Sequence, residues 1–192
     1  MITAFRKLHT GRLVLTPRDP KAAIAPLPLA DRLRNAGLIG QPLPDRGGAF
    51  ETGDRFLQLL AFTGCAVQLD TKSIGAGTAF THITLQGPYA TPQLLSGRNT
   101  RPPCCPVCGR ALGGWRARVQ QSTSDQAPNL CCEHCAAVEP GWRWTWGRNG
   151  GFGCSFVCVE EVFPGEAAPL PVLFETLLSL GVGDWRHFFV QA

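Results

Sequence analysis

Four cysteines in two matched pairs are the residues of this chain whose types and spacing most clearly indicate chemistry. The pairs read Cys-Pro-Val-Cys at 105–108 and Cys-Glu-His-Cys at 132–135. Two such segments can bring four soft thiolates to one tetrahedral ion, which is the coordination that Zn²⁺ prefers. We therefore expect a single Zn²⁺ ion bound by Cys105, Cys108, Cys132 and Cys135. Four protein ligands leave no open position for water, so the expected role of the ion is structural.

Neighbouring residues leave alternatives to this ligand set. Cys104 and Cys131 each adjoin a pair, and Cys131 with His134 has a spacing that could also chelate. Disulfides, buried free thiols and an iron–sulfur cluster are further interpretations of the same cysteines. The chain has 9 cysteines, an odd number, and its first residues contain no apolar leader. Both features favour a metal site in a reducing compartment, so we expect a cytoplasmic location.

The segment that carries the pairs resembles the zinc-ribbon group of folds. Cys-Pro-x-Cys-Gly at 105–109 is followed, after 23 residues between Cys108 and Cys132, by the second Cys-x-x-Cys. The resemblance covers about 40 residues and implies a structural zinc and a pair of β-hairpins. It implies no particular activity, because such modules serve many functions. We expect residues 100–147, here called the cysteine module, to be an insertion.

Tryptophan and arginine residues accompany the cysteines. The run Trp-Arg-Trp-Thr-Trp at 142–146 would place three indoles on one face of a strand, and Trp-Arg-Ala-Arg at 115–118 is a similar run. Such residues could form a protein interface, stack nucleic-acid bases and contact phosphates, or cover the small core of the module. The candidate partner-binding residues are Trp115, Arg116, Arg118, Trp142, Arg143 and Trp144.

The excess positive charge of the chain lies in and beside the cysteine module. Residues 98–148 contain seven Arg and three acidic residues, and this difference of +4 equals the net charge of the whole chain. Four thiolates on a divalent ion contribute about −2, which leaves about +2 in this region. The basic surface is modest, so it favours a polyanionic partner only weakly.

The rest of the chain predicts an α+β fold. Apolar patterns indicate strands at 12–16, 65–69, 78–85, 154–163 and 185–190, and helices at 30–36, 54–63 and 169–180. Residues 87–103 contain 4 Pro and read as a linker. We expect residues 1–99, of which 1–50 are largely irregular, and 148–192 to form one domain. Its two helix–strand units predict a two-layer sandwich, with a ferredoxin-like order as one possibility.

No constellation of residues indicates catalysis. The 4 His are scattered along the sequence, and no Gly-rich segment has the spacing of a phosphate-binding loop. No apolar run approaches the ~18 residues of a membrane span, so we expect no membrane association. The sequence therefore favours a non-catalytic zinc-binding accessory protein that binds a protein partner. A nucleic-acid-binding protein and an enzyme with an unrecognised site are the alternatives.

Overall fold

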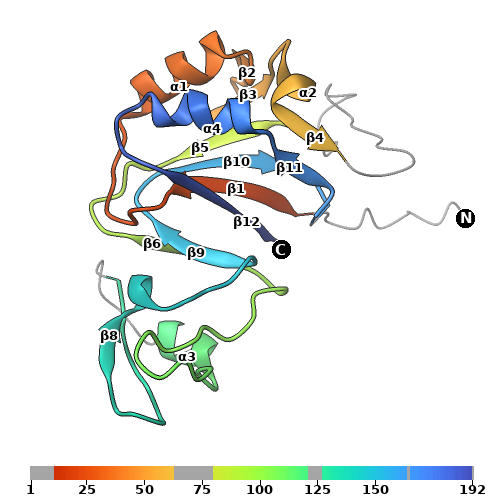
Figure 1. The fold of residues 1–192 in the computed structure, drawn as a ribbon. Coiled ribbons are helices and arrows are strands. Elements are labelled where there is room, and N and C mark those ends of the chain that lie inside the picture. Colours follow the sequence, from red (N-terminus) through yellow and green to blue (C-terminus); the bar gives the residue numbers. More distant parts are fainter. Residues whose placement is uncertain (1–10, 63–79, 121–126, 164, 192) are drawn as a thin grey trace, which may run out of the picture.

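A six-stranded antiparallel sheet forms the centre of the molecule (Figure 1). The structure is a computed structural model, and it describes residues 11–62, 80–120, 127–163 and 165–191. Every neighbouring pair of strands in the sheet is antiparallel. The strands lie in the order β12 (Trp185–Val190), β1 (Arg12–Pro17), β10 (Phe156–Glu160), β5 (Ile83–Gln86), β3 (Ala49–Thr52) and β2 (Ile39–Pro42).

The central strands are apolar on both faces because both faces of the sheet are covered. In β1, Leu13 and Leu15 belong to the core on one face, and Val14 belongs to a second cluster on the other. In β10, Val157 belongs to the core on the first face, and Cys158 belongs to the cluster on the other face. Side chains alternate across a strand, so an unbroken apolar run predicts a strand that is buried on both sides.

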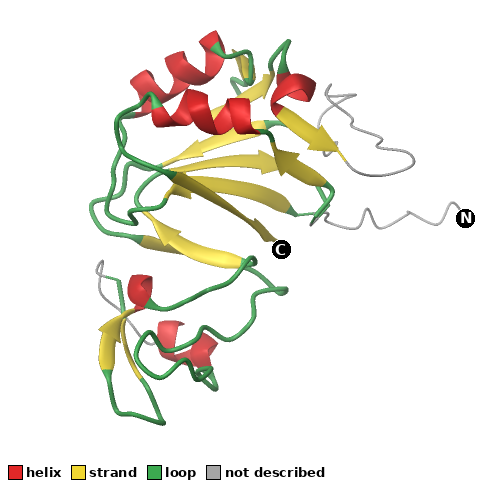
Figure 2. Cartoon of the chain, in the orientation of Figure 1, coloured by secondary structure: helices red, strands yellow, loops and turns green. Residues whose placement is uncertain are grey.

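Three helices cover one face of the sheet: α1 (Pro26–Asn35), α2 (Phe56–Leu59) and α4 (Pro171–Leu178) (Figures 1 and 2). Both longer helices begin with proline, whose missing amide costs nothing in the first turn. They bury Leu29 and Leu33 of α1 and Leu173 and Leu177 of α4 against the sheet. A short strand pair, β4 (Leu60–Phe62) with β11 (Ala167–Pro169), flanks this layer.

The opposite face is covered by a second strand pair, β6 (Gln93–Ser96) with β9 (Gly150–Gly153). β9 reads Gly-Gly-Phe-Gly because it packs directly on the sheet. A Cβ on Gly151 would lie 3.0 Å from the ring of Phe188, and one on Gly153 would lie 2.9 Å from the ring of Phe156. Only glycine permits so close an approach.

The cysteine module follows β6 in the sequence and ends before β9, so this strand pair lies at the base of the module (Figure 1). It contains α3 (Trp115–Gln120), the hairpin β7 (Asn129–Cys131) with β8 (Val138–Pro140), and one 3₁₀ turn, η1 (Gly141–Arg143). The placement of the module between two paired strands is compatible with an insertion, although the predicted domain limits themselves stay a prediction.

Several predicted elements are confirmed and others are wrong. Strand 12–16 is β1, strand 185–190 is β12, helix 30–36 lies in α1 and helix 169–180 contains α4. The predicted helix 54–63 is wrong in extent: α2 spans four residues before the chain turns into β4. The predicted linker 87–103 contains β6, and strand 154–163 is shorter, as β10. Strand 78–85 is also shorter: among its described residues, β5 begins only at Ile83.

The coarse fold class, mixed helices and antiparallel sheet, agrees with the α+β prediction. The two-layer description is incomplete, because β6 and β9 add a layer on the face away from the helices. Strand 65–69, which the ferredoxin-like order requires, lies outside the described residues.

Candidate metal centre

The two cysteine pairs lie in two turns with the same backbone hydrogen bonds. In the first turn the amide of Cys105 donates to the carbonyl of Arg110, and that of Gly109 donates to the carbonyl of Cys105. In the second turn the amide of Cys132 donates to Ala137, and that of Ala136 donates to Cys132. The residue before each turn is paired in the same way, Cys104 with Ala111 and Cys131 with Val138. The sequence Cys-Cys-x-x-Cys therefore forms one local structure twice.

The turns face each other and bring four sulfur atoms together. The Sγ atoms of all four pair cysteines lie within 4.8 Å of one another. Cys105 Sγ lies 3.7 Å from Cys135 Sγ, and Cys108 Sγ lies 3.6 Å from Cys132 Sγ. Four sulfurs at a Zn–S distance of ~2.3 Å would stand about 3.8 Å apart at the corners of a tetrahedron. The arrangement thus suits one metal ion of this size.

The four cysteines are free thiols in the structure and form no disulfide with one another. A disulfide bond is ~2.05 Å long, and the sulfurs here are separated by 3.6 and 3.7 Å. The burial of the ligands also repeats between the turns: the first cysteine of each pair is buried and the second is exposed. One side of the candidate centre therefore faces the interior of the module, and the other faces solvent.

The electrostatics of the cluster favour a cation. Hydrogen bonding from the backbone of His134 is the largest cause that lowers the pKa of Cys132, to about 6. The backbone of Ala137 acts to lower the pKa of Cys135, but burial and the three neighbouring thiols raise it to about 12 overall. Four clustered thiols cannot all ionise without a compensating charge. A divalent cation supplies that charge and holds the thiolates together.

The alternative ligands stand outside this cluster. In the described part of the chain, the only group of metal-ligating side chains that meets within ligand distance consists of Cys105, Cys108, Cys132 and Cys135. The exposed Cys131 has its Sγ 3.9 Å from the carbonyl of Cys132, and His134 is exposed as well. Cys131 and His134 are therefore not members of this four-residue cluster.

A tryptophan-rich core, here called the indole core, supports the candidate centre. Trp146 is in edge contact with Trp115 at 5.1 Å between ring centroids and with Phe152 of β9 at 5.6 Å. Its Nε1 donates to the carbonyl of Gly141 at 2.8 Å. The buried members of the core are Cys105, Leu112, Trp115, Leu130, Cys132, Trp144, Trp146 and Phe152. The core thus joins two candidate metal ligands to a strand that packs on the main sheet.

The predicted strand face of three indoles is wrong. Trp142 lies in the 3₁₀ turn η1, and the next residues continue as an irregular segment. Trp144 and Trp146 are 3% and 4% exposed, and Trp115 on α3 is 5% exposed. Hydrophobic burial overrides the strand pattern, because a module this small needs its indoles as core. The burial agrees with the interpretation in which tryptophan covers the core of the module. Of the candidate partner-binding residues, Trp115 and Trp144 are therefore not accessible to a partner.

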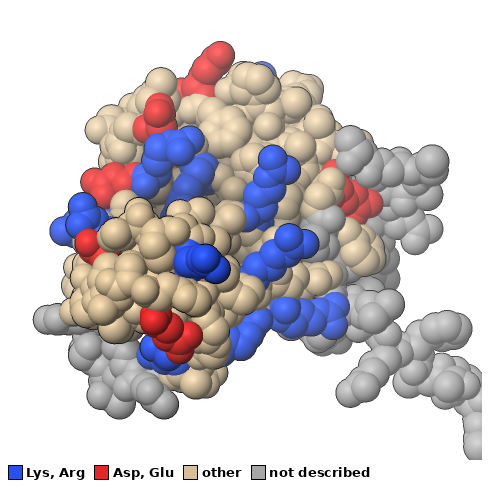
Figure 3. All heavy atoms as spheres, turned by 60° about the horizontal axis from the view of Figure 1, so that its bottom comes forward, with Lys and Arg blue, Asp and Glu red and all other residues tan. Residues whose placement is uncertain are grey.

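Three arginines of the module, Arg116, Arg118 and Arg143, contact neighbouring groups of the chain. Arg118 pairs with Glu133, and Arg143 pairs with Glu139 at 3.0 Å. Arg116 donates to the carbonyl of Gly97 at 2.7 Å and lies over the ring of Trp115. The contact of Arg116 ties α3 to the segment that leads into the module. All three arginine side chains remain partly exposed to solvent. Figure 3 shows Lys and Arg side chains along one side of the module face.

The remaining candidate catalytic groups are in structural surroundings. Burial, with the charge of Asp19 as a second cause, raises the pKa of Cys154. Burial raises the pKa of Cys158 to about 12, with Glu160 adding to the effect. His82 Nδ1 donates to the carbonyl of Phe80 at 2.8 Å, and its Nε2 faces Arg46. The raised pKa of both cysteines is the opposite of what an activated thiol nucleophile needs. Cys65 lies outside the described residues.

Two features escaped the sequence analysis. Lys21, far from the module in the sequence, lies with its Nζ 4.8 Å from the ring centroid of Trp142. Arg148 and His187 line a common pocket, although 38 residues separate them in the sequence. Only the fold brings these residues together, so spacing could not have shown either pair.

Comparisons with known proteins identify no relative of this chain. No family model matches the chain, and neither the curated proteins nor the solved structures contain a match to it. Among the described residues, no helix is long and apolar enough to cross a membrane.

Proposed function

We propose that this chain is a non-catalytic accessory protein in which one structural Zn²⁺ ion, bound by Cys105, Cys108, Cys132 and Cys135, shapes a surface that binds a protein partner. The observation that carries the metal assignment is the convergence of two equivalent cysteine turns on four sulfurs within 4.8 Å. All four ligands come from the protein, so the ion would act as scaffold. A zinc-ribbon-like module is consistent with this geometry, and a reducing compartment such as the cytoplasm would keep the thiols available.

Support for a protein partner comes from Trp142. It is the only one of the 5 tryptophans outside the buried core, and the centroid of its ring lies 4.8 Å from Lys21 Nζ and 6.0 Å from Arg143 Cζ. Trp142 and Lys21 line a pocket of about 420 Å³ where the module meets the sheet domain, together with Asn129, Pro140 and Cys154. A partly exposed indole beside Lys21 suits an acidic segment that also carries an apolar side chain.

Nucleic acid is the weaker candidate for the same surface. Arg118 and Arg143 are already paired with Glu133 and Glu139, and Arg116 is bonded to backbone carbonyls. A phosphate backbone would have to compete with these partners. The buried Trp115 and Trp144 also offer no ring face for base stacking.

The test is co-purification from the native host with and without nuclease, comparing the natural chain with Trp142→Ala and with the control Leu57→Ala. Leu57 is 65% exposed, and it lies on α2, in the helix layer on the other side of the sheet. We expect a protein that survives nuclease treatment, is lost with Trp142→Ala and is kept with Leu57→Ala. A partner that is released by nuclease, or kept by Trp142→Ala, contradicts the proposal.

A further inference from the structure

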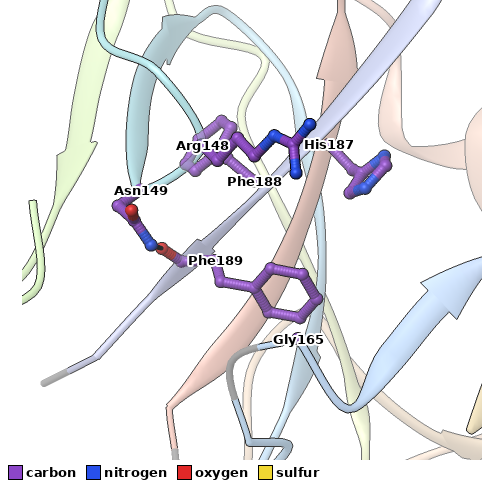
Figure 4. A pocket seen from close by; sticks show the side chains of 6 residues that line it. All are labelled: Arg148, Asn149, Gly165, His187, Phe188 and Phe189. Carbon is purple, nitrogen blue, oxygen red and sulfur yellow. Dashed lines mark hydrogen bonds between the residues drawn. The ribbon is translucent and has the colours of Figure 1, made fainter. Parts of the chain in front are cut away.

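A pocket on the edge strand of the sheet is independent of the metal centre. It has a volume of about 570 Å³ and is lined by Arg148, Asn149, Gly165, His187, Phe188 and Phe189 (Figure 4). Arg148 and Asn149 precede β9, and the histidine and both phenylalanines belong to β12. The volume lies within the range of about 300–1,000 Å³ that small-molecule sites occupy. We call this site the Arg148 pocket.

The backbone around the Arg148 pocket is fixed. The amide of Phe189 donates to the carbonyl of Arg148 at 2.9 Å, and the side chains of Asn99 and Asn149 donate to the carbonyl of Phe189 at 3.1 and 3.5 Å. Thr100 Oγ1 donates to the carbonyl of Asn149. The segment that carries Arg148 is thus bound to β12, and its guanidinium extends toward His187 (Figure 4).

Aromatic rings position the imidazole. The ring of His187 lies 6.0 Å from that of Phe174 on α4 and 6.3 Å from that of Phe189, nearly perpendicular to the latter. Figure 4 shows the ring of Phe189 extending toward Gly165, away from the guanidinium. The pocket therefore has two basic groups at one side and an apolar ring at the other.

The described lining of the Arg148 pocket carries basic side chains. None of the described residues that line it is acidic, and Arg148 forms no ion pair within the described part of the chain. Burial is the main cause that lowers the pKa of His187, and the charge of Arg148 adds to the effect. An anion would find a guanidinium for paired hydrogen bonds and an imidazole beside it.

We propose that the Arg148 pocket binds a small organic anion that combines a carboxylate or a phosphate with a flat ring. The oxyanion contacts Arg148 and His187, and the ring packs against Phe189. A planar guanidinium can form paired hydrogen bonds with a carboxylate or with a phosphate. An aromatic carboxylate and a nucleotide therefore both carry a charged group that suits Arg148. The ring supplies apolar area that a bare ion lacks.

The test is titration calorimetry of the metal-loaded full chain with four probes: benzoate, adenosine 5′-monophosphate, inorganic phosphate and adenosine. We expect saturable binding of benzoate or of the nucleotide, and the tighter of the two identifies the source of the oxyanion. Adenosine, which lacks the charge, should bind more weakly than its monophosphate. Inorganic phosphate, which lacks the ring, should bind more weakly as well, and equal affinity would overturn the role of Phe189.

The variant Arg148→Gln, with Arg110→Gln as an exposed control on the cysteine module, separates the site from general charge effects. Loss of one charge-assisted contact should weaken binding about tenfold or more in Arg148→Gln and leave it unchanged in Arg110→Gln. Melting temperature reports whether each variant is folded. Equal affinity in Arg148→Gln and the natural chain, or no saturable binding of either charged ring compound, would overturn the proposal.

Discussion

Gly109 and Ala136 occupy the same position in the two cysteine turns. Both have a positive φ, +72° and +58°, and each donates its amide to the carbonyl of the first cysteine of its turn. The first turn places glycine where the left-handed conformation requires it, and the second places alanine there. Alanine in this region is strained by roughly 1–2 kcal/mol, so the second turn is held in place by the rest of the site.

This equivalence predicts opposite effects for two exchanges. Ala136→Gly should stabilise the metal-loaded protein by roughly 0.5–1 kcal/mol, and Gly109→Ala should destabilise it by a similar amount. A Cβ on Gly109 would meet no atom within 4 Å, so the second effect is one of backbone conformation alone. Denaturant unfolding followed by tryptophan fluorescence measures both. Effects of the same sign in the two variants would show that the turns are not equivalent.

Trp146 and Trp142 should respond differently to truncation. Trp146 is buried between Trp115 and Phe152, and we expect Trp146→Ala to cost about 3–5 kcal/mol of unfolding free energy. Trp142 is partly exposed in η1, so Trp142→Ala should cost much less, although it removes the proposed partner contact. Denaturant unfolding of the metal-loaded variants gives both values. A larger loss for Trp142→Ala would contradict the assignment of core and surface.

The close packing of β9 on the sheet should require glycine at position 153. A Cβ on Gly153 would lie 2.9 Å from the ring of Phe156, so Gly153→Ala should destabilise the protein by about 1–3 kcal/mol. Gly47 is the matched control, because a Cβ there would meet nothing within 4 Å and its φ is not positive. Thermal unfolding of Gly153→Ala and Gly47→Ala tests this, and an equal loss in both would argue against the close approach of β9.

Thiol reactivity should follow burial. Alkylation proceeds through the thiolate, and burial raises the pKa of Cys158 to about 12, so at pH 8 this thiol stays protonated as well as shielded. Cys131 is exposed and stands outside the proposed ligand set. Iodoacetamide treatment of the metal-loaded protein, followed by peptide mass spectrometry, should label Cys131 and leave Cys158 unmodified. Equal labelling of the two would show that Cys158 is accessible.

The cysteine cluster and the strands β1 and β12 were predictable because their signals are local. Two Cys-x-x-Cys segments bring their own turns with them, and the apolar run of β1 is typical of a strand, although the predicted two layers omit the cover on its second face. The same holds for α4, whose proline start and leucine spacing are contained in one segment.

The roles of the tryptophans were not predictable because they depend on the tertiary structure. The Trp-Arg-Trp-Thr-Trp run alternates like a strand, but Trp144 and Trp146 are drawn into one core by Trp115 and Phe152, which come from other segments. β6 lies between prolines and has only four residues, so its pairing with the glycine-rich β9 has no local signature. The contact of Lys21 with Trp142 likewise exists only in the folded chain.

The metal content of the chain shows whether the four cysteines bind one structural ion. Elemental analysis with native mass spectrometry should give one zinc ion per chain in the natural protein and in Cys131→Ser. Cys105→Ser and Cys132→Ser should lose the ion, and tryptophan fluorescence should show the indole core exposed to water. Full metal content and unchanged fluorescence in Cys105→Ser and Cys132→Ser, or metal loss in Cys131→Ser, would contradict the account.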